Sequence, residues 1–80
     1  MNTKEAVAKR ILELCEERHM AVNALAIISG VSPSTIYSIL SEKSNNPGVV
    51  SLKKLCDGFG ITLGEFFDTP EFDALEQEIK

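Results

Sequence analysis

The chain has 80 residues, a formal net charge of −4 and a hydrophobic share of 44%. This length supports one small domain, and the hydrophobic share is too high for a disordered chain. With one histidine, and with Cys15 and Cys56 outside CxxC spacing, no metal-ligand set is present, so no metal or other cofactor is expected. No nucleophile–base pair and no glycine-rich phosphate loop is visible, which argues against an enzyme.

The N-terminal residues lead directly into a charged amphipathic stretch, which is unlike a signal peptide. The longest uncharged run contains serines, Asn23, Gly30 and Pro33, so it does not fit a membrane span. We therefore expect a soluble cytoplasmic protein in which both thiols are reduced and buried or half-buried.

The negative charge is concentrated at one end of the chain. Residues 65–80 sum to −5, which leaves +1 on residues 1–64. The net charge therefore does not exclude a nucleic-acid partner for the first part of the chain.

Taken in chain order, the first predicted element is a helix over about residues 3–18. Asn2 and Glu5 have the spacing of a capping box at its start. Apolar residues then recur at helical intervals, with charged residues between them: Val7, Ile11, Leu14 and Cys15.

A second, short helix is predicted over residues 21–29, ending at Gly30. Ser32 and Pro33 then have the identities of an N-cap and a first helical residue, and they open a third helix over about residues 33–41. Its apolar face consists of Ile36, Ile39 and Leu40. Its polar face consists of Ser34, Tyr37, Ser38 and Ser41.

Residues 42–48 form a turn-rich segment, and a fourth helix follows over about residues 49–59. Its predicted buried residues are Leu52, Leu55, Cys56 and Phe59. Thr62 and Glu65 form a second capping box, which opens a short fifth helix.

Thr69 and Pro70 open a sixth, acidic and amphipathic helix over residues 69–80, with its apolar face at Phe72, Leu75 and Ile79. No strand pattern is visible. The expected fold is all-α: a compact five-helix domain over residues 1–68, followed by this short C-terminal helix.

The second and third predicted helices, joined through glycine, form a helix-turn-helix. The turn requires Gly30, which we expect at a positive φ. A small residue, Ala26, stands where the second helix crosses close to the first. Four apolar residues are spaced to lock the pair together: Leu25, Val31, Ile36 and Ile39.

Two segments, "ALAIISGVSPSTIYSIL" and "NPGVVSLKKLCDGFGITLGEFF", resemble the phage-repressor family of helix-turn-helix domains, the Cro/repressor or XRE type. The resemblance extends over residues 10–67. It implies that the helix over residues 33–41 enters the major groove of DNA while the preceding helix crosses the backbone.

Carried over position by position, the resemblance implies a set of DNA-binding residues. Those facing base edges would be Ser32, Pro33, Ser34, Tyr37 and Ser38. Those lying near phosphates would be Ser41, Lys43, Asn45, Asn46, Arg10 and the N–H groups around Val22 and Asn23.

The chain also departs from the family pattern. Ala21 and Val22 replace a frequent Ser-Gln pair, and Pro33 and Ser38 stand where long polar side chains are common. Short hydroxyls do not form the bidentate base contacts that arginine or glutamine makes. We therefore expect low single-domain affinity and a homodimer on a pseudo-palindromic operator.

The sequence favours a sequence-specific transcriptional regulator, most simply a repressor. The alternative is an interaction module or antitoxin-like partner with weak DNA binding and a protein-binding patch at Val22, Ile27 and Pro33. The C-terminal helix either folds back near Leu12 and Cys15 or pairs with a second copy. We favour the second arrangement, with contributions from Phe66 and Phe67.

Overall fold

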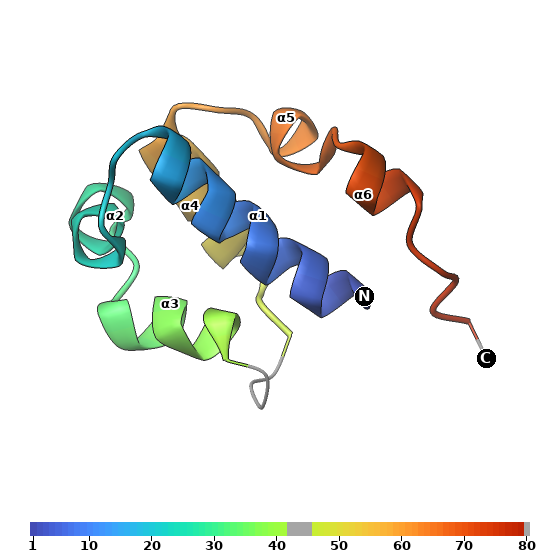
Figure 1. The fold of residues 1–80 in the computed structure, drawn as a ribbon. Helices are drawn as coiled ribbons and strands as arrows, with labels where there is room; N and C mark the ends of the chain where they lie inside the picture. The colour runs from blue at the N-terminus through green and yellow to red at the C-terminus, as the bar shows by residue number, and fades with distance from the viewer. Residues whose placement is uncertain (42–45, 80) are drawn as a thin grey trace.

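A computed structural model of the chain describes residues 1–41 and 46–79, and these residues contain helices and no strand. In chain order the helices are α1 (Thr3–Glu17), α2 (Val22–Ser29), α3 (Pro33–Leu40), α4 (Val49–Phe59), α5 (Leu63–Phe67) and α6 (Pro70–Asp73). In Figure 1, α1 crosses the middle of the molecule, with α2 and α3 toward one end and α5 and α6 toward the other. The all-α prediction is confirmed, and no described helix is long and apolar enough to cross a membrane.

Local capping chemistry sets most of the helix starts. The side chain of Asn2 accepts a hydrogen bond from the Glu5 N–H, and the Glu5 carboxylate accepts from the Asn2 N–H, so the first capping box is formed. The hydroxyl of Thr62 and the carboxylate of Glu65 form the second one at the start of α5. Both predictions from the sequence are confirmed.

The turn between α2 and α3 has the predicted form. Gly30 has a φ of 72°, in the left-handed region, and its N–H donates to the Ala26 carbonyl to close α2. Ser32 then caps α3 by accepting from the Thr35 N–H, and Pro33 is the first helical residue. The helix-turn-helix geometry therefore follows from residues that are close together in the sequence.

One continuous core joins the first five helices. Its fully buried side chains are Ile11, Leu25, Ile36, Leu55, Cys56 and Phe66. Both cysteines are free and buried, as expected, and burial raises the pKa of each thiol, which disfavours the reactive thiolate. Leu40, predicted on the apolar face of α3, is only half-buried.

The prediction of a sixth helix extending to the end of the chain is wrong. Thr69 and Pro70 open it as expected, but α6 ends at Asp73 after a single turn. Only Phe72 reaches the core, while Ile79 is 86% exposed, so little apolar burial is available to extend the helix. The acidic residues in this segment also interact unfavourably with the negative C-terminal end of a helix dipole.

The expected contribution of Phe66 to a dimer is also wrong. Phe66 is fully buried in its own chain. Its ring lies 4.9 Å from that of Phe67 and 6.1 Å from that of Phe72, measured between centroids. The start of the C-terminal segment therefore folds back on its own domain, where α6 contacts α1.

Candidate nucleic-acid interface

The outer face of α3 carries the side chains predicted to meet base edges. Ser34, Tyr37 and Ser38 are exposed, and Tyr37 is 54% exposed, whereas Ile36 and Ile39 on the opposite face are buried. Because the buried pair fixes the rotation of α3, the polar face points away from the protein. No other described element covers these side chains.

Hydroxyl groups cluster where α3 begins. The Ser32 Oγ lies 2.8 Å from the Thr35 Oγ1 and 3.3 Å from the Ser34 Oγ. Since Ser32 also caps the helix, its hydroxyl first serves to hold α3 in place. Pro33 beside it is exposed.

The structure brings Ser34 and Ser38 together with Asn46, which lies before α4. These three residues line one hollow of about 260 Å³ with Gly48 and Ser51. A glycine at the N-cap of α4 offers no side-chain hydrogen bond, so the first N–H groups of this helix are left uncapped beside the hollow. Gly48 and Ser51 were not among the residues predicted from the sequence, although a glycine before an apolar helical run is the signal of an uncapped helix start.

A second uncapped helix start lies at α2. Ala21 provides no side-chain cap to α2, Asn23 is exposed, and Val22 is half-buried against the core. Free N–H groups at a helix start favour an anion. The starts of α2 and α4 therefore both offer uncapped backbone N–H groups.

Comparison with known proteins agrees with this geometry. Residues 10–71 match the family described as the Cro/C1-type HTH DNA-binding domain. The chain belongs to the Cro/C1-type family. The chain is also 33% identical over 66 residues to the HTH-type transcriptional regulator PuuR of Escherichia coli (strain K12) and to that of Shigella flexneri. That alignment covers 82% of this chain and 35% of each relative, so the chain spans about a third of their length.

A solved structure shares the fold. The crystal structure of the prophage Lp1 protein 11 has a TM-score of 0.82 to this chain at 28% sequence identity. The comparison covers 94% of this chain and the whole of that chain. The Cro/C1-type architecture therefore extends over nearly the entire chain.

The structure gives Arg10 a role different from the predicted phosphate contact. Its Nε donates to the Phe66 carbonyl at 2.8 Å and its Nη2 to the Glu65 carbonyl at 3.1 Å. These bonds direct the guanidinium to the end of α5, which lies on the other side of α1 from α3 in Figure 1. Arg10 thus connects α1 to α5 through hydrogen bonds within this Cro/C1-type domain. We therefore do not include it among the proposed DNA contacts.

Two other cations of the α1 region are used in the same way. The Arg18 Nε donates to the Phe59 carbonyl at the end of α4, and Lys4 donates to the Ser41 carbonyl at the end of α3. The helices α3, α4 and α5 have no basic residue in their own last turn, so α1 and the residue after it supply the positive charge that a helix C-terminus favours.

The structure describes only some of the remaining residues that were predicted to contact phosphates. Ser41 follows α3 and is exposed, whereas Lys43 and Asn45 lie outside the described residues. Lys53 on α4 is paired with Asp57.

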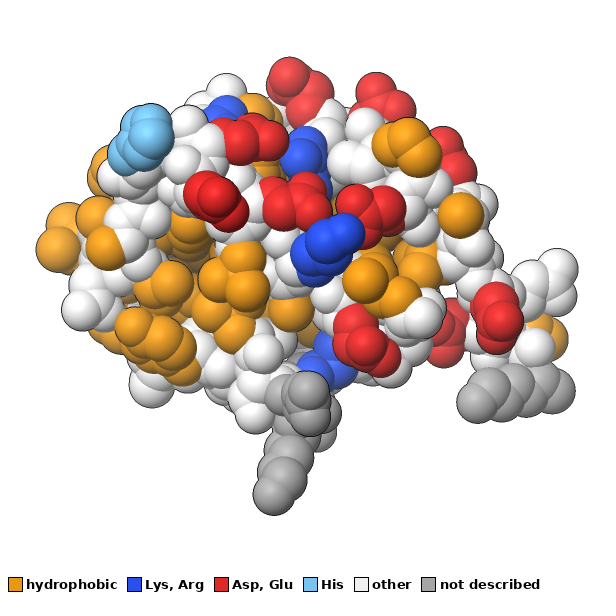
Figure 2. All heavy atoms as spheres, in the orientation of Figure 1, with side chains coloured by type: hydrophobic (Ala, Val, Ile, Leu, Met, Phe, Trp, Pro, Cys, Tyr) orange, Lys and Arg blue, Asp and Glu red, His pale blue; other side chains and the backbone are white. Residues whose placement is uncertain are grey.

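Charge divides one face of the domain into two regions. In Figure 2, acidic side chains gather over α1, α5 and α6, while the region over α2 and α3 shows hydrophobic and uncharged groups. On the acidic side, a hydrogen bond to Glu71 raises the pKa of Lys9, helped by the nearby Glu13. The helix-turn-helix therefore lies on the less acidic side of the domain.

Proposed function

We propose that the chain is a sequence-specific DNA-binding transcriptional regulator, most simply a repressor, that reads the major groove with α3. The observation that carries this proposal is the uncovered polar face of α3, at Ser34, Tyr37 and Ser38, in a Cro/C1-type domain. The printed names of the PuuR relatives, which are transcriptional regulators, support the same function.

The proposed contacts fall into two groups. Hydroxyls of Ser34, Tyr37 and Ser38 meet base edges, alongside Pro33 and the capping Ser32. Phosphates are held by backbone N–H groups and short side chains rather than by a row of lysines. The phosphate group comprises the N–H groups around Val22 and Asn23, those at the start of α4, Ser41, Asn46, Ser51, Lys43 and Asn45.

Such an interface binds weakly as a single copy. Lys43 is the one lysine or arginine among these proposed phosphate contacts, so few counterions are released and the salt dependence is shallow, and no bidentate pair worth about 1–3 kcal/mol is available from these hydroxyls. We therefore propose that a homodimer binds two half-sites spaced by roughly 34–36 Å, about one turn of the double helix.

The test begins with selection of binding sites from a random duplex pool, followed by titration of the selected DNA. Ser34→Asp and Ser38→Asp each place a carboxylate in the groove. Both variants should lower affinity more than about 30-fold, because juxtaposed like charges cost several kcal/mol. Their melting temperatures should stay close to wild type, since both side chains are exposed.

Gly64→Asp is the matched control, because it adds the same charge at an exposed position of α5, where a Cβ would meet only the Thr62 Oγ1 at 3.7 Å. This variant should bind the selected DNA within about threefold of wild type, in line with screened interactions over long distances. Wild-type affinity in both serine variants would refute the assignment of α3 to the groove.

A second candidate function rests on the exposure of two isoleucines on α2. Ile27 is 84% exposed and Ile28 is 59% exposed, which suits contact with a protein partner. In that case the chain would be an interaction module or the antitoxin-like partner of another protein, with weak DNA binding. The selection from the random duplex pool separates the two functions, since an interaction module of this kind would enrich no DNA sequence.

A further inference from the structure

The acidic C-terminal region runs from α6 back to the start of α1, and one hydrogen bond attaches it to α1 near each of its ends. The Glu71 carboxylate accepts a hydrogen bond from the Lys9 Nζ at 2.6 Å. Seven residues later, the Glu78 carboxylate accepts from the Thr3 hydroxyl at 2.7 Å. The residues after Asp73 are not helical, and the two contacts bring the region between them alongside α1, from Lys9 to Thr3.

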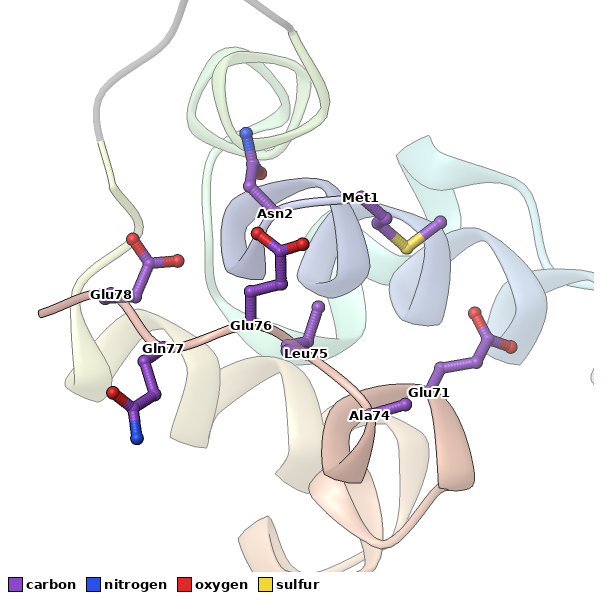
Figure 3. Close-up of a pocket in the computed structure, with 8 residues that line it drawn as sticks. All are labelled: Met1, Asn2, Glu71, Ala74, Leu75, Glu76, Gln77 and Glu78. Atoms are coloured by element: carbon purple, nitrogen blue, oxygen red, sulfur yellow. The ribbon is translucent and has the colours of Figure 1, made fainter. Parts of the chain in front are cut away.

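Figure 3 shows where the carboxylates of this segment lie. Glu76 projects toward Asn2 at the start of α1, and Glu78 projects toward the segment that leads into α4. A second hollow confirms the latter placement, because Glu78 lines it together with Lys4, Asn46 and Pro47.

This position is the edge of the proposed DNA interface. Asn46 is a proposed phosphate contact, and Lys4 donates to the carbonyl of Ser41, another proposed phosphate contact. The Glu78 carboxylate therefore lies beside a group that would receive the DNA backbone, and it shares a hollow with Lys4. Glu76, two residues earlier on the same segment, adds a second negative charge at the start of α1.

We propose that the docked acidic segment, residues 74–79, is an electrostatic brake on DNA binding. It repels phosphates from the edge formed by Ser41 and Asn46, and it offsets the charge of Lys4. The inference rests on the proposed DNA-binding function and adds a regulatory element to it. The brake depends on where the carboxylates are held and not only on net charge.

The test compares two double variants that change the net charge equally. Glu76→Gln/Glu78→Gln neutralises the docked carboxylates. Asp68→Asn/Asp73→Asn neutralises two exposed carboxylates of the same acidic region that do not line the hollow with Asn46. Affinity for the selected duplex is measured from about 50 mM to about 500 mM salt, a range over which the Debye length falls to a few ångströms.

We expect Glu76→Gln/Glu78→Gln to bind about three- to tenfold more tightly than wild type at about 50 mM salt, with the difference nearly lost at about 500 mM. The Asp68→Asn/Asp73→Asn control should stay within about twofold of wild type. Equal affinities of all three proteins, or equal gains in both double variants, would overturn the brake while leaving the DNA-binding function intact. Absence of binding by every protein would overturn both proposals.

A third variant tests the docking itself. Thr3→Val removes the hydroxyl that holds Glu78 but keeps every charge. If the held position matters, Thr3→Val should bind more tightly than wild type, though less tightly than the variant with neutral side chains. Unchanged affinity in Thr3→Val would contradict a brake that depends on this contact.

Discussion

At the scale of single residues, Gly30 forms the left-handed turn that joins α2 to α3. Nothing lies within 4 Å of the position that a Cβ would occupy there, so a Cβ meets no steric obstacle. The constraint is the backbone, whose φ of 72° is unfavourable for L side chains and worst for β-branched ones. The cost of a substitution at Gly30 is therefore conformational, and it differs between side chains of similar size.

Gly30→Val should destabilise the domain by about 1–3 kcal/mol and lower its melting temperature by roughly 5–15 °C. Gly30→Asn is the matched variant, because asparagine tolerates the left-handed region, and it should lose less than half as much. Thermal unfolding followed by circular dichroism measures both. Equal melting temperatures for Gly30→Val and wild type would contradict this account of the turn.

Residue types and spacing predicted the features that depend on neighbours in the sequence. The two capping boxes, the Ser32–Pro33 start of α3 and the positive φ of Gly30 each involve residues within a few positions of one another. The role of Arg10 was not predictable in this way. Its partners, the carbonyls of Glu65 and Phe66, lie more than 50 positions along the chain and meet Arg10 only after folding.

At the scale of helices, the α2–α4 contact is the most extensive in the described structure. The two helices approach closely at Gly58, where a Cβ would lie 3.0 Å from the Ile28 Cγ2 and the Ser29 Cβ, and 3.3 Å from the Ser29 Cα. A methyl group at this position would press against the backbone of α2 and not only against the end of a flexible side chain. The glycine therefore permits the two helices to approach closely.

Gly58→Ala should lower the free energy of unfolding by about 1 kcal/mol, because overpacking outweighs the higher helix propensity of alanine. Gly64→Ala is the control, since its Cβ would meet only the Thr62 Oγ1, at an ordinary 3.7 Å. That variant should be as stable as wild type or more stable. Chemical denaturation distinguishes the two, and a stabilised Gly58→Ala would show that the crossing is looser than described.

The sixth helix shows where periodicity is insufficient. Phe72, Leu75 and Ile79 have helical spacing, yet Leu75 is only half-buried and Ile79 is exposed. A short helix is stabilised mainly by packing its apolar face against another surface. The residues beyond α6 do not form such a face, and they contact α1 through a hydrogen bond from the Thr3 hydroxyl to the Glu78 carboxylate. The sequence shows the pattern but not whether a partner surface lies within reach.

At the scale of the whole molecule, the hydrogen bonds of three cations limit which groups remain for DNA binding. Lys4, Arg10 and Arg18 stabilise the C-terminal ends of α3, α5 and α4, so these cations serve the fold. DNA binding is therefore left to hydroxyls, helix starts and the few residues around the segment between α3 and α4. This distribution of contacts fits a domain that gains DNA affinity by dimerisation rather than by strong single contacts.

The most direct test of the central claim is titration of the ¹⁵N-labelled chain with the selected duplex, followed by amide chemical shifts. The account predicts that the shifts concentrate on Ser34, Tyr37 and Ser38 and on the uncapped starts of α2 and α4, while the amides of α5 remain nearly unchanged. Shifts confined to the exposed isoleucines of α2 or to α5 and α6, with α3 unaffected, would contradict it.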